Sequence, residues 1–142
     1  MPQRPIPQPT PETQEFWNGA KRHELRIQRC HNCGRAYFFP RPFCPNCGSD
    51  DVEWFTASGK GRLYSYVISE RPAPGFKDYV PYVIAVVELE EGPRMMTNIV
   101  GVEPEPENLA IDMPVEVTWE QQNDDITLMS FGRSAEGRVP TA

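Results

Sequence analysis

The sequence predicts a mainly β chain that begins with a short helix, continues through a metal-binding ribbon and ends in a five-stranded barrel. Three observations support this fold class. All four cysteines fall into two closely spaced pairs, the second half holds a series of short apolar segments, and 16 of the 142 residues are proline. We expect an arm and helix over 1–24, the ribbon over 25–57, the barrel over 58–133 and a loose tail over 134–142.

The N-terminal segment is expected to be a flexible arm followed by one short helix. Five prolines within residues 1–11 exclude a helix or a strand ladder there. Thr10 followed by proline predicts a helix N-cap, so that a helix runs over about residues 11–23. Phe16 and Trp17 lie on one side of this helix. That face either packs on the chain's own body or docks on a partner, and the second alternative makes both aromatics candidate partner-binding residues.

The cysteine pairs predict a metal site. Each pair has the form CxxCG, which places two thiolates on one tight turn, and the four ligands are expected to be Cys30, Cys33, Cys44 and Cys47. Four thiolates in two such turns suit a tetrahedral structural zinc ion. Two disulfides or buried free thiols are the alternatives. A single bound iron, as in an electron-transfer protein, is another. His31 lies inside the first pair. We interpret it as a solvent-facing turn residue; a metal ligand or proton carrier is the alternative.

Short strands are predicted around the cysteine turns. Residues 25–29 alternate in polarity, residues 37–39 return toward the second turn and residues 52–55 lead out, which gives a three-stranded ribbon. The following Ser-Gly-Lys-Gly at 58–61 marks the boundary to the barrel. It lacks the glycine spacing and the Ser/Thr after lysine of a phosphate-binding loop.

The second half predicts a barrel. Residues 81–88 are nearly all apolar, so this strand is expected to be covered on both faces. Leu63 and Val67 are expected to share one face of the first barrel strand. The longest connection, with a helical turn near 107–110, falls between the third and fourth strands. This order is typical of an OB-type Greek-key barrel, with strands at 62–69, 81–88, 95–102, 115–119 and 126–131.

Charge and composition restrict the partners and the compartment. Residues 1–50 carry seven Lys/Arg and four Asp/Glu, whereas residues 51–142 carry seven and sixteen, so net charges of +3 and −9 divide the chain. The acidic barrel half disfavours nucleic acid. The proline-rich start does not resemble a secretion signal, and the longest apolar run, 82–87, is too short to cross a membrane. Four thiolates favour a reducing compartment, so we expect the cytoplasm.

The sequence offers little catalytic chemistry. All four cysteines are assigned to the metal, and neither His23 nor His31 has a serine-and-carboxylate constellation beside it. A zinc ion closed by four thiolates also has no open position for water. We therefore expect no catalytic residues in this chain.

Several segments together resemble a zinc-ribbon/OB-fold family long designated a domain of unknown function. The resemblance covers roughly residues 10–131 and rests on TPETQEFWNGAKRHELRIQRC, CHNCGRAYFFPRPFCPNCGSDDVEW, ASGKGRLYSYVI, PYVIAVVELEEGPRMMTNIVG and MPVEVTWE. It implies a rubredoxin-like zinc ribbon held by the four cysteines, a C-terminal OB fold, and a partner enzyme. It further implies an acyl-CoA-associated accessory subunit of a thiolase-superfamily enzyme (a thiolase, acetyltransferase or retro-aldolase) in lipid or steroid metabolism. A subunit of a MaoC-like enoyl-CoA hydratase is the alternative, and a single-stranded nucleic-acid-binding protein is a more distant one.

Five further residues are candidates for contact with coenzyme A. Arg26, Arg29, Arg35 and Arg41 cluster in sequence around the cysteine turns, where guanidinium groups suit phosphate. Ordinary surface arginines are the alternative interpretation. Phe76 lies at the tip of a proline- and glycine-containing loop over 70–79, which either closes over an acyl or pantetheine chain or is simply exposed.

Overall fold

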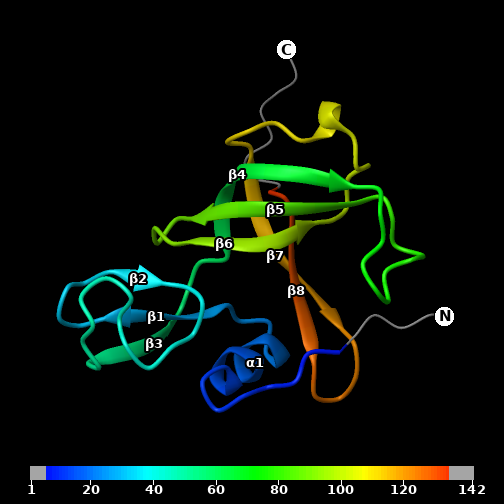
Figure 1. Ribbon diagram of the computed structural model, residues 1–142. Coiled ribbons are helices and arrows are strands. Elements are labelled where there is room, and N and C mark those ends of the chain that lie inside the picture. Colours follow the sequence, from blue (N-terminus) through cyan, green and yellow to red (C-terminus); the bar gives the residue numbers. More distant parts are fainter. Residues whose placement is uncertain (1–5, 135–142) are drawn as a thin grey trace.

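The computed structural model of the chain describes residues 6–134 and shows a helix, a small sheet and a barrel (Figure 1). The helix is α1 (Gln14–Lys21), and the small sheet contains β1 (Arg26–Cys30), β2 (Ala36–Tyr37) and β3 (Val52–Thr56). The barrel contains β4 (Lys60–Ser69), β5 (Tyr82–Leu89), β6 (Arg94–Ile99), β7 (Pro114–Gln121) and β8 (Thr127–Arg133). The predicted fold class is confirmed.

Helix α1 begins later than the sequence predicted. Residues 10–13 form a hydrogen-bonded turn, in which the Thr13 N–H donates to the Thr10 carbonyl at 3.0 Å and the Thr10 N–H donates to Thr13 Oγ1 at 2.9 Å. The helix starts only at Gln14, because these bonds hold the preceding residues outside it. Residues 1–5 of the predicted arm lie outside the described residues.

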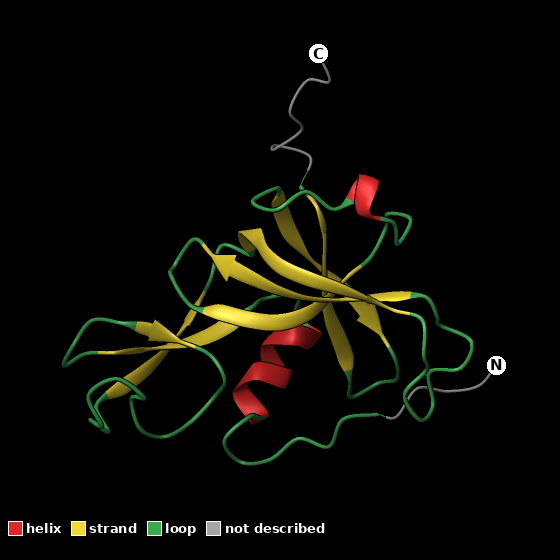
Figure 2. Ribbon diagram, turned by 45° about the horizontal axis from the view of Figure 1, so that its top comes forward, coloured by secondary structure: helices red, strands yellow, loops and turns green. Residues whose placement is uncertain are grey.

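Helix α1 joins the small sheet to the barrel, and Figure 2 shows it below the barrel and beside the small sheet. A Cβ atom at Gly19 would collide with the Arg26 side chain and lie 2.9 Å from the Glu24 carbonyl, so glycine permits the close approach to β1. Just beyond the C-terminal end of the helix, His23 stacks on Trp119 of β7 with ring centroids 5.9 Å apart. Lys21 also pairs with Asp125 in the β7–β8 hairpin at 3.7 Å.

The small sheet is antiparallel, with β1 between β2 and β3. Strand β1 leads directly into the first cysteine turn, since its last residue is Cys30. Strand β3 pairs with β1 along its whole length, from Arg26 opposite Thr56 to Cys30 opposite Val52. The sheet therefore fixes one cysteine turn and tethers it to the segment that enters the barrel.

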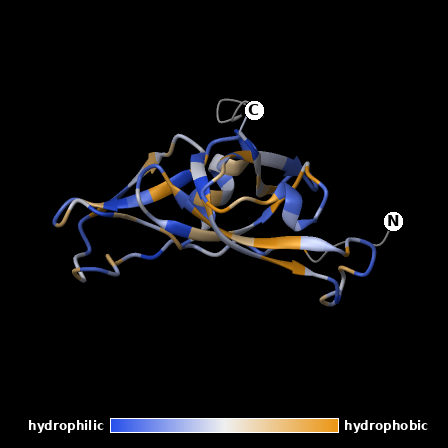
Figure 3. Ribbon diagram, turned by 90° about the horizontal axis from the view of Figure 1, so that it is seen from above, coloured by the Kyte–Doolittle hydropathy of each residue, from blue (hydrophilic) through white to orange (hydrophobic). Residues whose placement is uncertain are grey.

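The barrel is closed in the order β4-β5-β6-β8-β7, the strand order of an OB fold. All neighbouring strands are antiparallel except β6 and β8, which are parallel and pair only through Ile99 and Phe131. A short 3₁₀ helix, η1 (Pro106–Asn108), lies in the connection between β6 and β7 where a helical turn was predicted. Figure 3 shows both hydrophobic and hydrophilic segments along the strands. Fully buried side chains of the core include Leu63, Val83, Val87, Val115 and Phe131.

Two strand-face predictions are wrong. Leu63 is fully buried, but Val67 on the same strand is 59% exposed, because a bulge between Leu63 and Ser65 reverses the alternation of β4. Strand β5 is not covered on both faces: its burial alternates, with Val83 inside and Ile84 partly exposed. A barrel strand has one face inside and one outside, whereas the sequence suggested a strand between two layers.

The C-terminal boundary also differs from the prediction. Ser134, expected as the first residue of a loose tail, is buried and donates its N–H to the Pro114 carbonyl at 3.1 Å. It thus continues the pairing of β8 with β7. Residues 135–142 of the predicted tail lie outside the described residues.

Candidate metal centre

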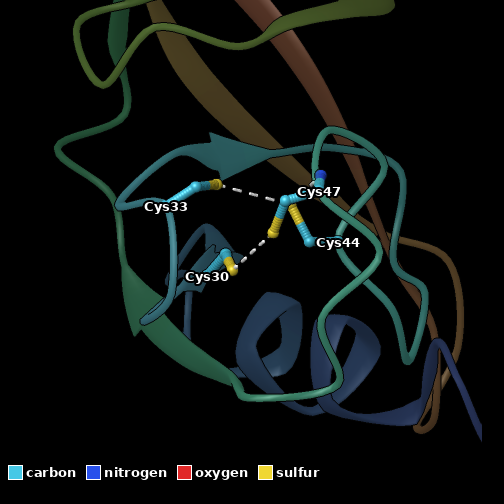
Figure 4. Close-up of side chains that lie close together, drawn as sticks. All are labelled: Cys30, Cys33, Cys44 and Cys47. Atoms are coloured by element: carbon cyan, nitrogen blue, oxygen red, sulfur yellow. Dashed lines mark hydrogen bonds between the residues drawn. The ribbon is translucent and has the colours of Figure 1, made fainter.

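The two cysteine turns have the same local geometry. In the first, the Gly34 N–H donates to the Cys30 carbonyl at 2.8 Å, and in the second the Gly48 N–H donates to the Cys44 carbonyl at 2.9 Å. Both glycines have a φ of +79°, a left-handed conformation that side chains resist. The CxxCG pattern therefore folds twice into one structure, and each turn directs two sulfur atoms toward the other turn (Figure 4).

The four sulfur atoms are arranged as a tetrahedral metal requires. They come from Cys30, Cys33, Cys44 and Cys47, and all lie within 4.8 Å of one another. The Cys30–Cys47 and Cys33–Cys44 sulfur pairs are each 3.6 Å apart. Zn–S bonds of about 2.3 Å in a tetrahedron place neighbouring sulfurs about 3.8 Å apart, and these two separations are close to that value. Cys30 and Cys44 are buried and Cys47 is exposed.

Hydrogen bonds stabilise the thiolate form of Cys33 and Cys47 but not that of Cys30. The Asn32 side chain donates to the Cys47 sulfur at 3.5 Å and is the main cause that lowers the pKa of Cys47 to about 6. The backbone N–H of Arg35 is the main cause that lowers the pKa of Cys33. At Cys30 the Cys33 backbone N–H lowers the pKa, but burial and the Cys47 side chain outweigh it and raise the pKa to about 11. Metal binding at such a site must release protons.

His31 points away from the sulfurs toward two carboxylates. Its Nδ1 lies 2.9 Å from Asp51 Oδ1 and its Nε2 lies 3.0 Å from Glu53 Oε2. These two hydrogen bonds, that of Asp51 first, raise the pKa of His31. The side chain is half exposed, at 49%. His31 thus ties the first cysteine turn to the start of β3, a role that the sequence did not reveal.

The four candidate arginines do not converge on one site. Arg26 donates from Nε to Glu15 at 3.0 Å and from Nη1 to Thr56 at 2.9 Å. Arg29 stacks over the Phe55 ring at 4.2 Å. Arg35 and Arg41 are exposed. The first two side chains therefore contact other elements of the chain, whereas the second two are exposed, with Arg41 Nε donating only to the nearby Phe39 carbonyl at 3.2 Å.

Arg35 lines a groove between the ribbon and the barrel. The groove measures about 570 Å³, and its lining includes Phe38, Glu91 and Arg94. Glu91 Oε2 accepts a hydrogen bond from the Ser58 N–H at 2.8 Å, whereas its Oε1 is buried and has no partner within residues 6–134. Two cationic side chains, Arg35 and Arg94, therefore line the groove, and Arg94 is already paired with Glu88 at 3.0 Å.

Phe76 lines a different cleft at the other end of the barrel. The cleft measures about 260 Å³, is mostly apolar, and includes Tyr82, Asn98 and Val100. The Phe76 ring packs against Tyr82 with centroids 5.6 Å apart. Strand β5 separates this cleft from the Arg35 groove, and its eight residues span about 26 Å. Tyr79 lines the cleft together with Tyr82. In the sequence, only the closeness of these tyrosines to Phe76 could have indicated that they belong to the same cleft.

Family comparisons match both halves of the chain. Residues 17–53 match the rubredoxin-like zinc ribbon domain of ChsH2, and residues 54–120 match the C-terminal OB-fold domain of ChsH2. A DUF35 domain-containing scaffold protein of Pyrococcus furiosus is 34% identical over 123 residues, which are 84% of this chain and 90% of that protein. The chain belongs to the DUF35 family.

Other DUF35 relatives carry the names of enzyme subunits. A probable enoyl-CoA hydratase alpha subunit of Thermomonospora curvata is 42% identical over 82% of this chain, but the match covers only 36% of that longer protein. Benzoylsuccinyl-CoA thiolase subunit BbsA of Geobacter metallireducens is 29% identical over 75% of this chain and 71% of its own length. A solved structure described as the Ltp2-ChsH2(DUF35) aldolase has a TM-score of 0.76 and 38% identity, covering 89% of this chain and 98% of that chain.

The two candidate partner-binding aromatics of this DUF35 chain differ in accessibility. Phe16 is only 7% exposed and packs within the chain's own core, 5.7 Å from the Phe38 ring. Of the two alternatives for this helix face, the structure favours packing on the chain's own body for Phe16, and contact of Phe16 with a partner stays a prediction. Trp17 is partly buried and meets Phe16 edge-on at 5.0 Å, so its role toward a partner stays a prediction.

No helix in the described part of the chain is long and apolar enough to traverse a bilayer.

Proposed function

We propose that this chain is a non-catalytic accessory subunit that binds a thiolase-superfamily enzyme and supports its reaction on an acyl-CoA. The observation that carries the proposal is the likeness to the Ltp2-ChsH2(DUF35) aldolase chain, at 38% identity over 98% of that chain. The names of the scaffold and thiolase-subunit relatives support the same class of role.

The metal centre has a structural task in this proposal. Cys30, Cys33, Cys44 and Cys47 hold one Zn²⁺, which fixes the two turns against each other. Four thiolates fill the coordination sphere of zinc, so the ion activates no water. The chain has four cysteines in all, so no thiol remains as a nucleophile and the partner supplies the reacting groups. Thiolates of this kind suit the reducing cytoplasm, where we place the protein.

Contact with acyl-CoA is the second part of the proposal. Arg35 and Arg41 are exposed and have no carboxylate partner within residues 6–134, which suits contact with phosphate, whereas Arg26 and Arg29 are engaged in internal contacts. The apolar cleft beside Phe76 suits part of an acyl or pantetheine chain. Phe76→Ala is expected to raise the partner's KM for acyl-CoA several-fold more than it lowers kcat. An unchanged KM would remove Phe76 from the ligand site.

A MaoC-like enoyl-CoA hydratase is the second candidate partner. The hydratase alpha subunit of Thermomonospora curvata has the highest identity among the relatives named above, at 42%. That protein is much longer than the matched region, so its activity does not transfer to this chain by likeness alone. The two candidates differ in the enzyme that each predicts beside this chain.

Co-purification from the native host tests the proposal. The chain with an affinity tag is isolated under mild conditions, and bound proteins are identified by mass spectrometry. We expect a thiolase-superfamily enzyme in fixed ratio, whose activity on its acyl-CoA falls when the chain is removed. A hydratase in its place selects the second candidate. Isolation of the chain alone, or turnover of a thioester by the purified chain, would overturn the proposal.

A further inference from the structure

The loop between β2 and the second cysteine turn exposes two large aromatic side chains. Phe39 is 54% exposed and Phe43 is 57% exposed, and in the ribbon region, 25–57, the structure shows no other large hydrophobic side chain so open to solvent. Arg41 lies between them in sequence and is also exposed. We name residues 39–43 the aromatic loop.

The aromatic loop is held in place by buried partners. The Arg41 backbone N–H donates to Gln28 Oε1 at 2.8 Å, and Tyr37 Oη donates to the Arg41 carbonyl at 2.8 Å. Gln28 and Tyr37 are only 4% and 6% exposed. Proline at positions 40 and 42 further limits the backbone. The exposed rings therefore project from a preorganised backbone, so binding them to a surface costs less conformational entropy.

The arginine of this loop has no acidic partner. Arg41 Nε donates to the Phe39 carbonyl at 3.2 Å, and within residues 6–134 no carboxylate lies within ion-pair distance of its guanidinium. By contrast, Arg62 and Arg94 on the barrel both pair with Glu88. Aromatic residues and arginine are the residue types that dominate protein–protein binding energy. The aromatic loop combines both residue types in largely exposed positions: Phe39 meets the Phe38 ring edge-on at 5.5 Å, and Arg41 has no carboxylate partner within residues 6–134.

We propose that the aromatic loop is the surface by which this chain docks on its partner enzyme, a surface that offers an apolar recess for the phenylalanines and a carboxylate for Arg41. The inference rests on the proposed function for the identity of the enzyme. Charge favours this occupant, because the loop belongs to residues 1–50, which carry a net charge of +3, and Arg41 would face a carboxylate of the enzyme. The segments outside the described range, 1–5 and 135–142, contain only Met1 and Val139 as large apolar residues and are poor candidates to cover it.

A second exposed apolar surface on the barrel serves as a matched control. Val67 and Met96 on the outer face of β4–β6 are 59% and 70% exposed. This surface lacks a comparable unpaired charge, since Arg94 both pairs with Glu88 and covers the Tyr64 ring at 3.9 Å. If exposed apolar area alone determined docking, the barrel surface would matter as much as the aromatic loop.

The experiment measures the Kd between the purified chain and the enzyme identified by co-purification. Phe39→Ala, Phe43→Ala and Arg41→Glu are each expected to weaken binding about tenfold or more. Val67→Ala and Met96→Ala are expected to stay within about twofold of the wild type. All five side chains are exposed, and the zinc content and melting temperature of each variant show whether it is folded. Losses confined to the barrel variants would overturn the inference and leave the proposed function intact.

A photo-crosslinking residue at position 39, with position 96 as control, tests docking even when the partner has not been identified. The crosslinked protein is identified by mass spectrometry and its binding to Phe43→Ala is compared with the wild type. Crosslinking from position 39 to an acyl-CoA enzyme supports both proposals. Crosslinking to a protein of another class supports the loop and refutes the proposed function. Crosslinking to a second copy of this chain, or none from position 39, refutes the docking inference.

Discussion

At the scale of single residues, Glu88 on the outer face of β5 makes a pH prediction. Hydrogen bonds from Arg62 at 2.6 Å and Arg94 at 3.0 Å, with that of Arg62 the larger cause, lower the pKa of Glu88 from its ordinary value. A lowered pKa in the folded state means that the stabilisation is complete above the unfolded value and is lost as pH falls through the folded value. The free energy of unfolding should therefore differ less between pH 6 and pH 3 in Glu88→Gln than in the wild type. Urea unfolding at both pH values measures this, and an unchanged difference would contradict it.

Phe16 makes a second residue-scale prediction. Its ring is buried at 7% exposure among core residues, so Phe16→Ala removes core volume and should lower the free energy of unfolding by about 3–5 kcal/mol. Gln14→Ala, an exposed position on the same helix, is the control and should change it by less than about 0.5 kcal/mol. Urea denaturation of both variants gives the comparison. A small loss at Phe16 would make this residue a candidate partner contact again.

The sequence predicted the residues of the site unevenly. The cysteine positions follow from spacing, because a CxxCG turn is a local structure that depends on few distant contacts. The arginines do not behave in the same way: Arg26 and Arg29 lie three residues apart on β1 and point to opposite faces. Their partners, Glu15 and Phe55, come from other elements, and the sequence gives no sign of these contacts.

At the scale of elements, the small sheet should depend on the metal. Its strand β2 has only two residues, so hydrogen bonding alone holds it weakly. Structural zinc contributes about 10–16 kcal/mol in isolated fingers. Removal of the ion by a chelator, or Cys44→Ser, should therefore raise amide hydrogen exchange in β1–β3 far more than in β5. Elemental analysis should find one zinc and no iron per chain before chelation, and equal exchange increases in both regions would contradict a local role.

Strands were easier to predict than their faces. All five barrel strands were located within a few residues, because each combines an apolar pattern with turn residues on both sides. The bulge in β4 was not visible in the sequence, since Tyr64 and Ser65 fit either register. The outer face of β5 is also apolar, so the sequence alone suggested a strand between two layers. Only the closed barrel shows which face lies inside and which lies outside.

At the scale of the whole molecule, the division of charge predicts weak interaction with nucleic acid. Residues 51–142 carry a net charge of −9, and phosphate contacts supply most of the non-specific affinity for DNA and RNA. Fluorescence anisotropy with labelled single-stranded oligonucleotides should show no saturable binding at about 150 mM salt. Tight binding under these conditions would support the alternative that the chain is a single-stranded nucleic-acid-binding protein. Any residual binding of the oligonucleotide at low salt should involve residues 1–50, which carry the net charge of +3.

The relative placement of the three parts could not be predicted from the sequence. It depends on contacts between distant residues, such as His23 with Trp119 and Lys21 with Asp125. The helix was expected to have an apolar face, but its partners were left open between the chain itself and another protein. The structure assigns most of that face to the chain, with Phe16 in the core and Gly19 against β1.

The single residue pair between β6 and β8 has a consequence for motion. Ile99 and Phe131 form that pair, and the Val100 N–H adds one further bond to the Phe131 carbonyl at 2.8 Å. Fewer backbone bonds must break here than at any other strand junction of the barrel, so transient opening should begin at this seam. Ile99 and Val100 also line the cleft beside Phe76. A ligand bound in the cleft would then either promote or suppress opening of the β6–β8 junction. Its binding would be detectable as a changed rate of amide hydrogen exchange at this one junction.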